Sequence, residues 1–306
     1  MIKNSIIVNP ISGRGNGAKL SPLIETYLTK LSLDFDLHHT EYPRHAIQLA
    51  EQAVTDGYDV VVAVGGDGTA NEVLNGLLQA TQMGSYDCAI GLIPVGRGND
   101  FAFGAQIPPA LEVACTTIAR GKRRWIDVGF VQGGDYPQGR YFGNGIGIGF
   151  DAVVGFEALK LKRLHGFPSY IVAALKTISL YFNAPTLQIE FNGTTLTQPS
   201  LLVSVMNGRR MGGGFMMAPN GRMDDGLFDL CIARQVSRAG ILRLIPRFMK
   251  GNQAGHPAIR TDLAAHVTVT ALKGSLPAHA DGETLCVAGK RLEARIVPHA
   301  LQIMVP

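Results

Sequence analysis

A buried strand that runs directly into a glycine-rich turn constrains this chain more than any other feature. Residues 60–64 are four valines and an alanine, and they lead into Gly65-Gly66-Asp67-Gly68-Thr69. Apolar residues then recur on one face of a predicted helix at residues 73–78. A strand, a glycine turn and a helix leave backbone N–H groups free at the helix N-terminus, where they favour an anion such as phosphate. Because a plain turn does not need Asp67 and Thr69 as well, the loop predicts a nucleotide site.

The composition indicates a folded protein of one large or two moderate domains. The chain has 306 residues, of which 46% are hydrophobic and 17% charged. Its formal charge of +4 is mild and gives no reason to expect a nucleic-acid partner. The chain shows neither a signal-peptide pattern nor an apolar run long enough to span a bilayer, so we expect a cytoplasmic protein. The four cysteines are far apart and show no metal or redox spacing, which predicts buried free thiols.

The first part of the chain alternates predicted strands and helices. Strands are expected at residues 5–10, 35–40, 60–64 and 87–95, with helices at 18–31, 45–55, after the glycine loop, and at 109–120. This order predicts an α/β domain with a doubly wound parallel sheet over residues 1–122. Ligands of such sheets bind beyond the carboxyl ends of the strands, so the glycine-rich turns there should cluster.

From about Trp125 the pattern changes to strands with few helices. Strands are predicted at residues 126–128, 141–150, 187–191, 201–206, 227–232 and 267–271, and helices at 151–164, 169–182 and 238–250. Asn192-Gly193 is a hairpin signal between two of them. We therefore expect a mainly antiparallel, sandwich-like second domain over residues 123–294, and a last strand whose segment of about 295–306 returns to the first domain.

Two further glycine turns carry groups that suit phosphate. In residues 9–17, NPISGRGNG, the turn offers amides, the Ser12 hydroxyl and the Arg14 guanidinium, which suit a polyphosphate or a ribose. In residues 92–102, LIPVGRGNDFA, Arg97 would reach a phosphate, while Asn99 suits either a ligand or a helix cap. Asp100 suits a metal, a substrate hydroxyl or the first turn of a helix.

Two acidic turns in the second half are candidates for proton transfer or metal binding. Asp281 and Glu283 flank Gly282, and either carboxylate suits a hydroxyl proton or Mg²⁺ if it faces the glycine turns. Asp225 with nearby backbone carbonyls suits a hard cation. Both segments are equally compatible with ordinary surface turns.

The three glycine turns, followed far downstream by Asp281-Gly282-Glu283, resemble in order and spacing the diacylglycerol kinase catalytic domain. The similarity is strongest to soluble bacterial lipid kinases, in a group that includes the sphingosine and ceramide kinases, and it covers nearly the whole chain. It implies an N-terminal domain that binds ATP, a sandwich-like C-terminal domain and an active cleft between them. It also implies Mg²⁺-dependent transfer of the γ-phosphoryl group to a lipid hydroxyl.

The resemblance also implies roles for individual residues. The nucleotide contacts would be Asn9, Ser12, Thr40, Gly66, Asp67, Gly68, Thr69 and Glu72. Glu283 would be the proton acceptor, with Asp67 as the competing candidate. A structural Mg²⁺ would lie at Asp225 and the carbonyls of Arg222 and Leu227. Arg97 departs from the family, which usually has a threonine at this position near the phosphates.

A lipid substrate implies transient contact with a membrane surface. Residues 238–250 predict an amphipathic helix with basic residues on its polar face, and residues 160–163 are also basic. A helix that merely packs on its own domain explains either segment as well, and a homodimer stays open. Two other functions remain: an NAD kinase, which the GRGNDFA turn disfavours, and a nucleotide-binding regulator with weak catalysis, which Arg97 keeps open.

Overall fold

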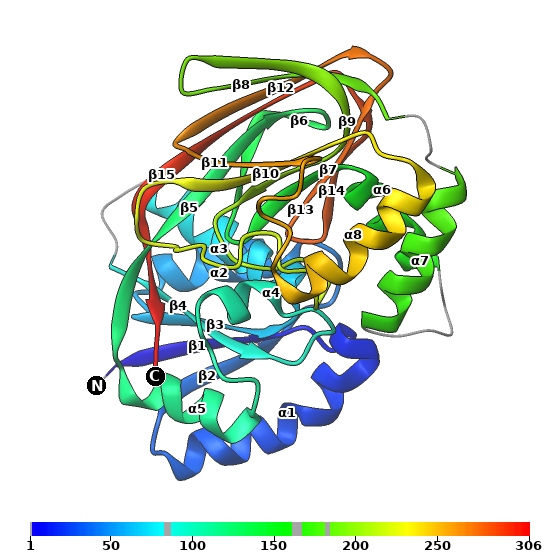
Figure 1. Cartoon of the computed structure of the whole chain (residues 1–306). Coiled ribbons are helices and arrows are strands. Elements are labelled where there is room, and N and C mark those ends of the chain that lie inside the picture. Colours follow the sequence, from blue (N-terminus) through cyan, green and yellow to red (C-terminus); the bar gives the residue numbers. More distant parts are fainter. Residues whose placement is uncertain (1, 83–86, 161–166, 181–183) are drawn as a thin grey trace. The chain divides into compact units, whose positions relative to one another are not determined.

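The computed structural model describes residues 2–82, 87–160, 167–180 and 184–306 (Figure 1). The chain divides into two compact units. Unit 1 comprises Met1–Val128 and Pro298–Pro306, and unit 2 comprises Gly129–Val297. Unit 1 thus continues beyond the predicted end at residue 122. The strands β5 (Arg123–Gly133) and β15 (Arg291–Met304) each run from one unit into the other.

Unit 1 is built on a parallel sheet with the strand order β4-β3-β1-β2. These strands are β1 (Lys3–Val8), β2 (Asp34–His39), β3 (Val60–Gly65) and β4 (Ala89–Pro94). Every residue of β3 is buried, which explains its run of valines. Ile303 of β15 pairs in parallel with Ile90 of β4, so the last strand contributes to this sheet.

The helices of unit 1 pack as pairs around this sheet, α1 with α5 and α2 with α3. Their bounds are α1 (Ser12–Lys30), α2 (His45–Thr55), α3 (Asp67–Gln82), α4 (Asp100–Gly104) and α5 (Leu111–Arg120). The core between α1, α5 and the sheet includes Ile24, Leu28, Val62 and Ile118. The doubly wound α/β class predicted from the alternating pattern is therefore confirmed.

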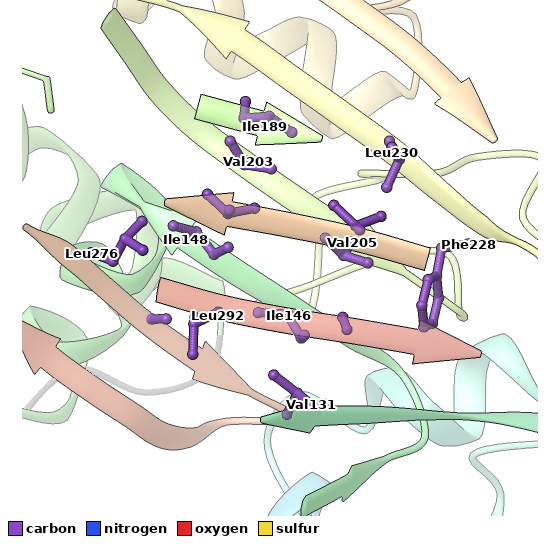
Figure 2. Close-up of a cluster of buried hydrophobic side chains, with 14 of the residues drawn as sticks. Val131, Ile146, Ile148, Ile189, Val203, Val205, Phe228, Leu230, Leu276 and Leu292 are labelled. Carbon is purple, nitrogen blue, oxygen red and sulfur yellow. The ribbon is translucent and has the colours of Figure 1, made fainter. Parts of the chain in front are cut away.

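Unit 2 is a mainly antiparallel, sandwich-like β structure. One path runs β14-β13-β7-β9-β10-β11, and another runs from β9 through β8 and β12 to β15. The strands not yet introduced are β6 (Tyr136–Phe142), β7 (Gly145–Gly149), β8 (Thr186–Phe191), β9 (Thr194–Met206), β10 (Phe228–Arg234), β11 (Ile259–Ala264), β12 (His266–Lys273), β13 (Leu276–Ala280) and β14 (Glu283–Gly289). Figure 2 shows side chains of both paths converging on one core, among them Ile148, Ile189, Val203 and Leu292.

The long strand β9 explains how helices are placed on this unit. Its first half alternates between exposed and partly buried residues, whereas its last seven residues are all buried. Both faces of that second half are covered. Val203 and Val205 belong to the sandwich core on one face. On the other face, α6 (Phe150–Lys160), α7 (Phe167–Leu180) and α8 (Arg238–Lys250) share a core with Leu202 and Met206. No described helix is long and apolar enough to cross a membrane.

Several elements differ from the sequence prediction. Residues 141–150 are not one strand: β6 and β7 are separated at Gly143-Asn144, where the Asp281 carboxylate binds the backbone. The strands β11, β13 and β14 were not predicted, because their short, mixed sequences lack a clear period. The last residues of the helices predicted at 151–164 and 169–182 lie outside the described residues. The Asn192-Gly193 hairpin and the helix at 238–250 are confirmed, and all four cysteines are free and buried.

Candidate active site

The three glycine turns of unit 1 meet at one edge of the sheet. The strands β4, β3 and β1 are neighbours and parallel, so the turns that follow them share the carboxyl edge. The backbone N–H groups of Val95 and Gly96 both donate to the Gly65 carbonyl, at 2.9 and 3.1 Å. A Cβ atom at Gly96 would lie 2.3 Å from the Cα of Gly66, so these two turns touch through their backbones. The expected cluster therefore forms, and glycine at these positions is what permits it.

The first turn holds a left-handed backbone that only its glycines adopt without strain. Gly13, Arg14 and Gly15 have φ angles of +57°, +61° and +89° inside the span of α1. A Cβ atom at Gly13 would lie 2.2 Å from the Val95 carbonyl oxygen. The Asn9 amide donates to the Thr69 hydroxyl at 2.9 Å, which ties this turn to the second one. Arg14 is exposed, and Ser12 lies within 3.7 Å of the Cβ position of Gly66.

Asp67 and Asn99 hold the second and third turns together. Asp67 Oδ1 accepts a hydrogen bond from the Phe101 amide at 2.9 Å, so it caps the short helix α4. The Asn99 side chain accepts from Gly96 N at 3.0 Å and donates to Gly96 O at 3.1 Å. This closes the turn and leaves Arg97 exposed at its tip. Asp67 and Asp100 both border Gly98, so two carboxylates lie close to the third turn.

Thr40 and Glu72 were both expected to contact the nucleotide, but only Thr40 lies at the carboxyl edge of the sheet without a side-chain role in the part of the scaffold that the structure describes. Thr40 directly follows β2, and its amide donates to the Val8 carbonyl at 2.9 Å, so it lies at the same edge of the sheet. Glu72 instead accepts hydrogen bonds from the amides of Arg44 and Ala46, at 3.1 and 3.2 Å. Its carboxylate therefore anchors the start of α2, a task that the sequence did not reveal.

In unit 2, the two carboxylates around Gly282 have different surroundings. Asp281 is 5% exposed, and its carboxylate accepts hydrogen bonds from the amides of Gly143, Asn144 and Gly145, at 2.7 to 3.0 Å. Glu283 is half-buried at the start of β14. Its carboxylate makes no hydrogen bond or ion pair with the residues that the structure describes. Asp281 thus holds the turn in place through its carboxylate, whereas the Glu283 carboxylate does not.

An apolar pocket with a cavity volume of about 60 Å³ lies within unit 2. Its walls come from α6, α7, α8, β9 and the 215–217 segment, and Asp151 is the single charged residue among those that line it. Asp151 Oδ2 is buried without a hydrogen bond and lies 3.7 Å from His279 Nε2. Sequence reasoning missed this pocket because its walls come from distant segments. The one available signal was an aspartate among apolar residues in the first turn of α6.

The acidic segment before β10 offers oxygen atoms for a hard cation. The Leu227 amide donates to Asp225 Oδ1 at 3.1 Å, and the Arg222 guanidinium pairs with Asp224 at 3.1 Å. Asp229 is an acid that the sequence analysis did not select: burial and the nearby Asp225 charge raise its pKa to about 6. Because the described residues hold no cluster of three or more acidic, histidine or cysteine side chains, Mg²⁺ here would also need the backbone carbonyls. The donor set, all oxygen, fits that ion.

Known proteins resemble both halves of the chain. Residues 3–131 match the model of the diacylglycerol kinase catalytic domain, and residues 144–305 match the YegS C-terminal NAD kinase beta sandwich-like domain. A diacylglycerol kinase of Mycobacterium tuberculosis (strain CDC 1551) is 31% identical, over 99% of this chain and 95% of its own. One of Staphylococcus aureus (strain RF122) is 29% identical, over 91% of this chain and 85% of its own.

The fold of a solved structure also matches over the full length. The crystal structure of a diacylglycerol kinase from Bacillus anthracis superposes with a TM-score of 0.76 at 21% identity. The match covers 100% of this chain and 97% of the other. At this identity the match shows a common fold.

Proposed function

The chain belongs to the diacylglycerol kinase family, and from this premise we propose that it transfers the γ-phosphoryl group of ATP to a lipid hydroxyl in the presence of Mg²⁺. Relatives named diacylglycerol kinase support kinase activity over nearly the whole length. The identity of the acceptor is the part of the proposal that rests on the geometry of this chain.

The glycine turns of unit 1 supply the groups that a triphosphate needs. The first intrahelical bond of α3 runs from Ala70 N to Gly66 O at 3.0 Å, so the amides of residues 67–69 precede it and suit an anion. Ser12 adds a hydroxyl, and the exposed Arg14 and Arg97 add two cations on separate turns. Where the family usually has a threonine near the phosphates, Arg97 would make a charged contact with them.

Glu283 is the better candidate for the general base. Phosphoryl transfer requires positioned phosphates, Mg²⁺ that neutralises their charge, and a group that accepts the proton of the attacking hydroxyl. Asp67 accepts a hydrogen bond from the Phe101 amide and Asp281 accepts three from amides, whereas the Glu283 carboxylate has no partner among the described residues. The carboxylates of Asp67 and Asp100 beside Gly98 would hold the Mg²⁺ that binds the phosphates.

The apolar pocket of unit 2 is the single observation that carries the choice of a lipid acceptor. A dinucleotide such as NAD needs polar groups for two riboses and a pyrophosphate, and a pocket with one carboxylate does not provide them. An acyl or sphingoid chain matches an apolar lining, and Asp151 would accept a hydrogen bond from its polar end. Since apolar walls discriminate poorly between chains, the pocket identifies the class of the acceptor and not the individual lipid.

A lipid panel tests the proposal. Purified protein with labelled ATP and Mg²⁺ is incubated with diacylglycerols, monoacylglycerols, phosphatidylglycerol or sphingoid bases in neutral detergent micelles, and products are resolved by mass. We expect at least one phosphorylated lipid and no NADP from NAD. NADP formation without lipid product would support the NAD kinase alternative, and ATP binding without any turnover would support a regulator.

A further inference from the structure

The helix α8 has two faces with different surroundings. Its inner face is apolar, and Ile241, Leu244 and Phe248 form part of the wall of the apolar pocket. Its outer face exposes Leu242 and Met249, which are 48% and 41% accessible. The helix contains four basic residues and no acid. Leu242 and Met249 thus interrupt the polar outer face that is typical of a helix packed on its own domain.

We propose that α8 docks unit 2 on an anionic membrane surface through this outer face, an inference that rests on the proposed lipid kinase function. The occupant is the headgroup region of a bilayer with negatively charged lipids. Because the inner face of the same helix lines the pocket, docking would bring the pocket wall to the membrane from which the substrate comes.

The order of residues around the helix supports this assignment. At about 100° per residue, Met249, Leu242, Pro246 and Ala239 form one exposed apolar strip. Arg238 borders the strip on one side, and Lys250, Arg243 and Arg247 follow on the other. Helices that lie in a membrane interface have this arrangement, with apolar residues inserted and basic side chains reaching the headgroups.

Three charges of this face, those of Arg243, Arg247 and Lys250, are available to an external partner. No carboxylate of the described residues forms an ion pair with Arg243, Arg247 or Lys250. The Arg247 guanidinium donates a hydrogen bond to the uncharged Asn252 carbonyl at 3.3 Å. A cation that is already paired with a carboxylate of its own domain attracts anionic lipids only weakly. These three cations are not paired in this way. Each basic residue near an anionic bilayer contributes about 1 kcal/mol of binding.

The neighbouring helix α7 also exposes apolar side chains. It packs beside α8 in unit 2 (Figure 1) and exposes Val172 and Leu175, one helical turn apart. A second copy of the chain is a poorer occupant, because a symmetric contact would oppose the cations of α8 to themselves. Charge thus favours a lipid surface over self-association.

Vesicle co-sedimentation without nucleotide tests the docking surface. The double variant Arg243→Glu/Lys250→Glu is compared with the wild type on vesicles of phosphatidylcholine, with and without phosphatidylserine. Loss of two cations at about 1 kcal/mol each predicts at least an approximately 30-fold weaker affinity for the phosphatidylserine vesicles. The control Lys273→Glu/Lys290→Glu makes the same charge change at exposed positions of the β structure and should bind like the wild type. Leu242→Ser/Met249→Ser should weaken binding without any charge change.

The outcomes separate this inference from the proposed function. If both charge variants lose vesicle affinity equally, or the wild type does not bind, docking through α8 is wrong. If Arg243→Glu/Lys250→Glu instead abolishes a dimer measured by analytical ultracentrifugation, the face is an interface between copies. The lipid panel in neutral micelles measures kinase activity independently of docking on an anionic membrane. Arg243→Glu/Lys250→Glu should retain its turnover in these micelles.

Discussion

The site of unit 1 is built from the backbone, whereas the pocket of unit 2 is built from side chains. In unit 1, three glycine turns meet because the strands before them are parallel neighbours, and a missing Cβ allows Gly96 to touch Gly66. In unit 2, side chains from three helices and one buried strand enclose the pocket. A site built from the backbone therefore leaves a compact signature in the sequence, whereas a pocket built from distant side chains leaves almost none.

The polar residues of the unit 1 turns illustrate a second difference. Asp67, Glu72 and Asn99 are the residues that make the motif conspicuous, and each hydrogen-bonds a backbone amide. These hydrogen bonds hold the starts of α4 and α2 and the third glycine turn in place. In unit 2, Asp281 likewise holds backbone amides, since its carboxylate accepts three hydrogen bonds from them. The neighbouring Glu283 lies at the edge of this turn.

Replacement of the proposed base should have the largest effect. Glu283→Gln keeps the size of the side chain and removes its ability to accept a proton, so we expect turnover to fall about 10²–10⁴-fold. ATP affinity, measured by calorimetry, should be unchanged because ATP is assigned to unit 1. If Glu283→Gln kept nearly wild-type turnover, Glu283 would not be the base, and Asp67 would become the leading candidate.

The Gly13→Ala variant tests the backbone site. Its Cβ atom would lie 2.2 Å from the Val95 carbonyl, so the turn must move and ATP affinity should fall by more than tenfold. The control Gly57→Ala also sits at positive φ, but nothing lies within 4 Å of its Cβ position. Both variants place alanine at a positive φ angle, but only Gly13→Ala should have a reduced affinity for ATP. Equal affinities would mean that the close approach of these turns does not matter for binding.

Glu72 separates a scaffold role from a ligand role. In Glu72→Ala the amides of Arg44 and Ala46 lose their acceptor, and removal of such a cap costs about 1 kcal/mol of unfolding free energy. Chemical denaturation should show this loss while the ATP affinity of the folded protein changes little. A large loss of affinity with unchanged stability would restore Glu72 as a direct nucleotide contact.

Replacement of Asp229 should have the smallest effect, a change in the stability of the fold that depends on pH. Its folded-state pKa is raised to about 6, so its charged form opposes folding above that pH and has no influence below about pH 4. Asp229→Asn should therefore raise the unfolding temperature near pH 7.5 in EDTA, by about 2–4 °C for an effect of ~1 kcal/mol. At pH 4 the two proteins should unfold together. Added Mg²⁺ should stabilise the wild type more than the variant if the cation binds beside Asp225.

The same contrast explains what the sequence could predict. The α/β pattern, the clustered glycine turns, the Asn192-Gly193 hairpin and the two-sided helix α8 follow from local periodicity and turn chemistry. The split between β6 and β7 does not, because it depends on the Asp281 carboxylate, 137 positions from Asn144. The capping role of Glu72 and the raised pKa of Asp229 likewise arise from tertiary contacts that no local pattern encodes.

The most direct test of this division of labour measures both ligands on one pair of variants. Gly13→Ala alters the unit 1 turn, and Ala174→Phe fills the unit 2 pocket, which Ala174 lines. The lipid that is phosphorylated in the panel and a non-hydrolysable ATP analogue are each titrated against both proteins, with circular dichroism confirming that they are folded. We predict that Gly13→Ala loses the nucleotide and keeps the lipid, while Ala174→Phe loses the lipid and keeps the nucleotide. Folded variants that lose both ligands together, or neither, would contradict the account.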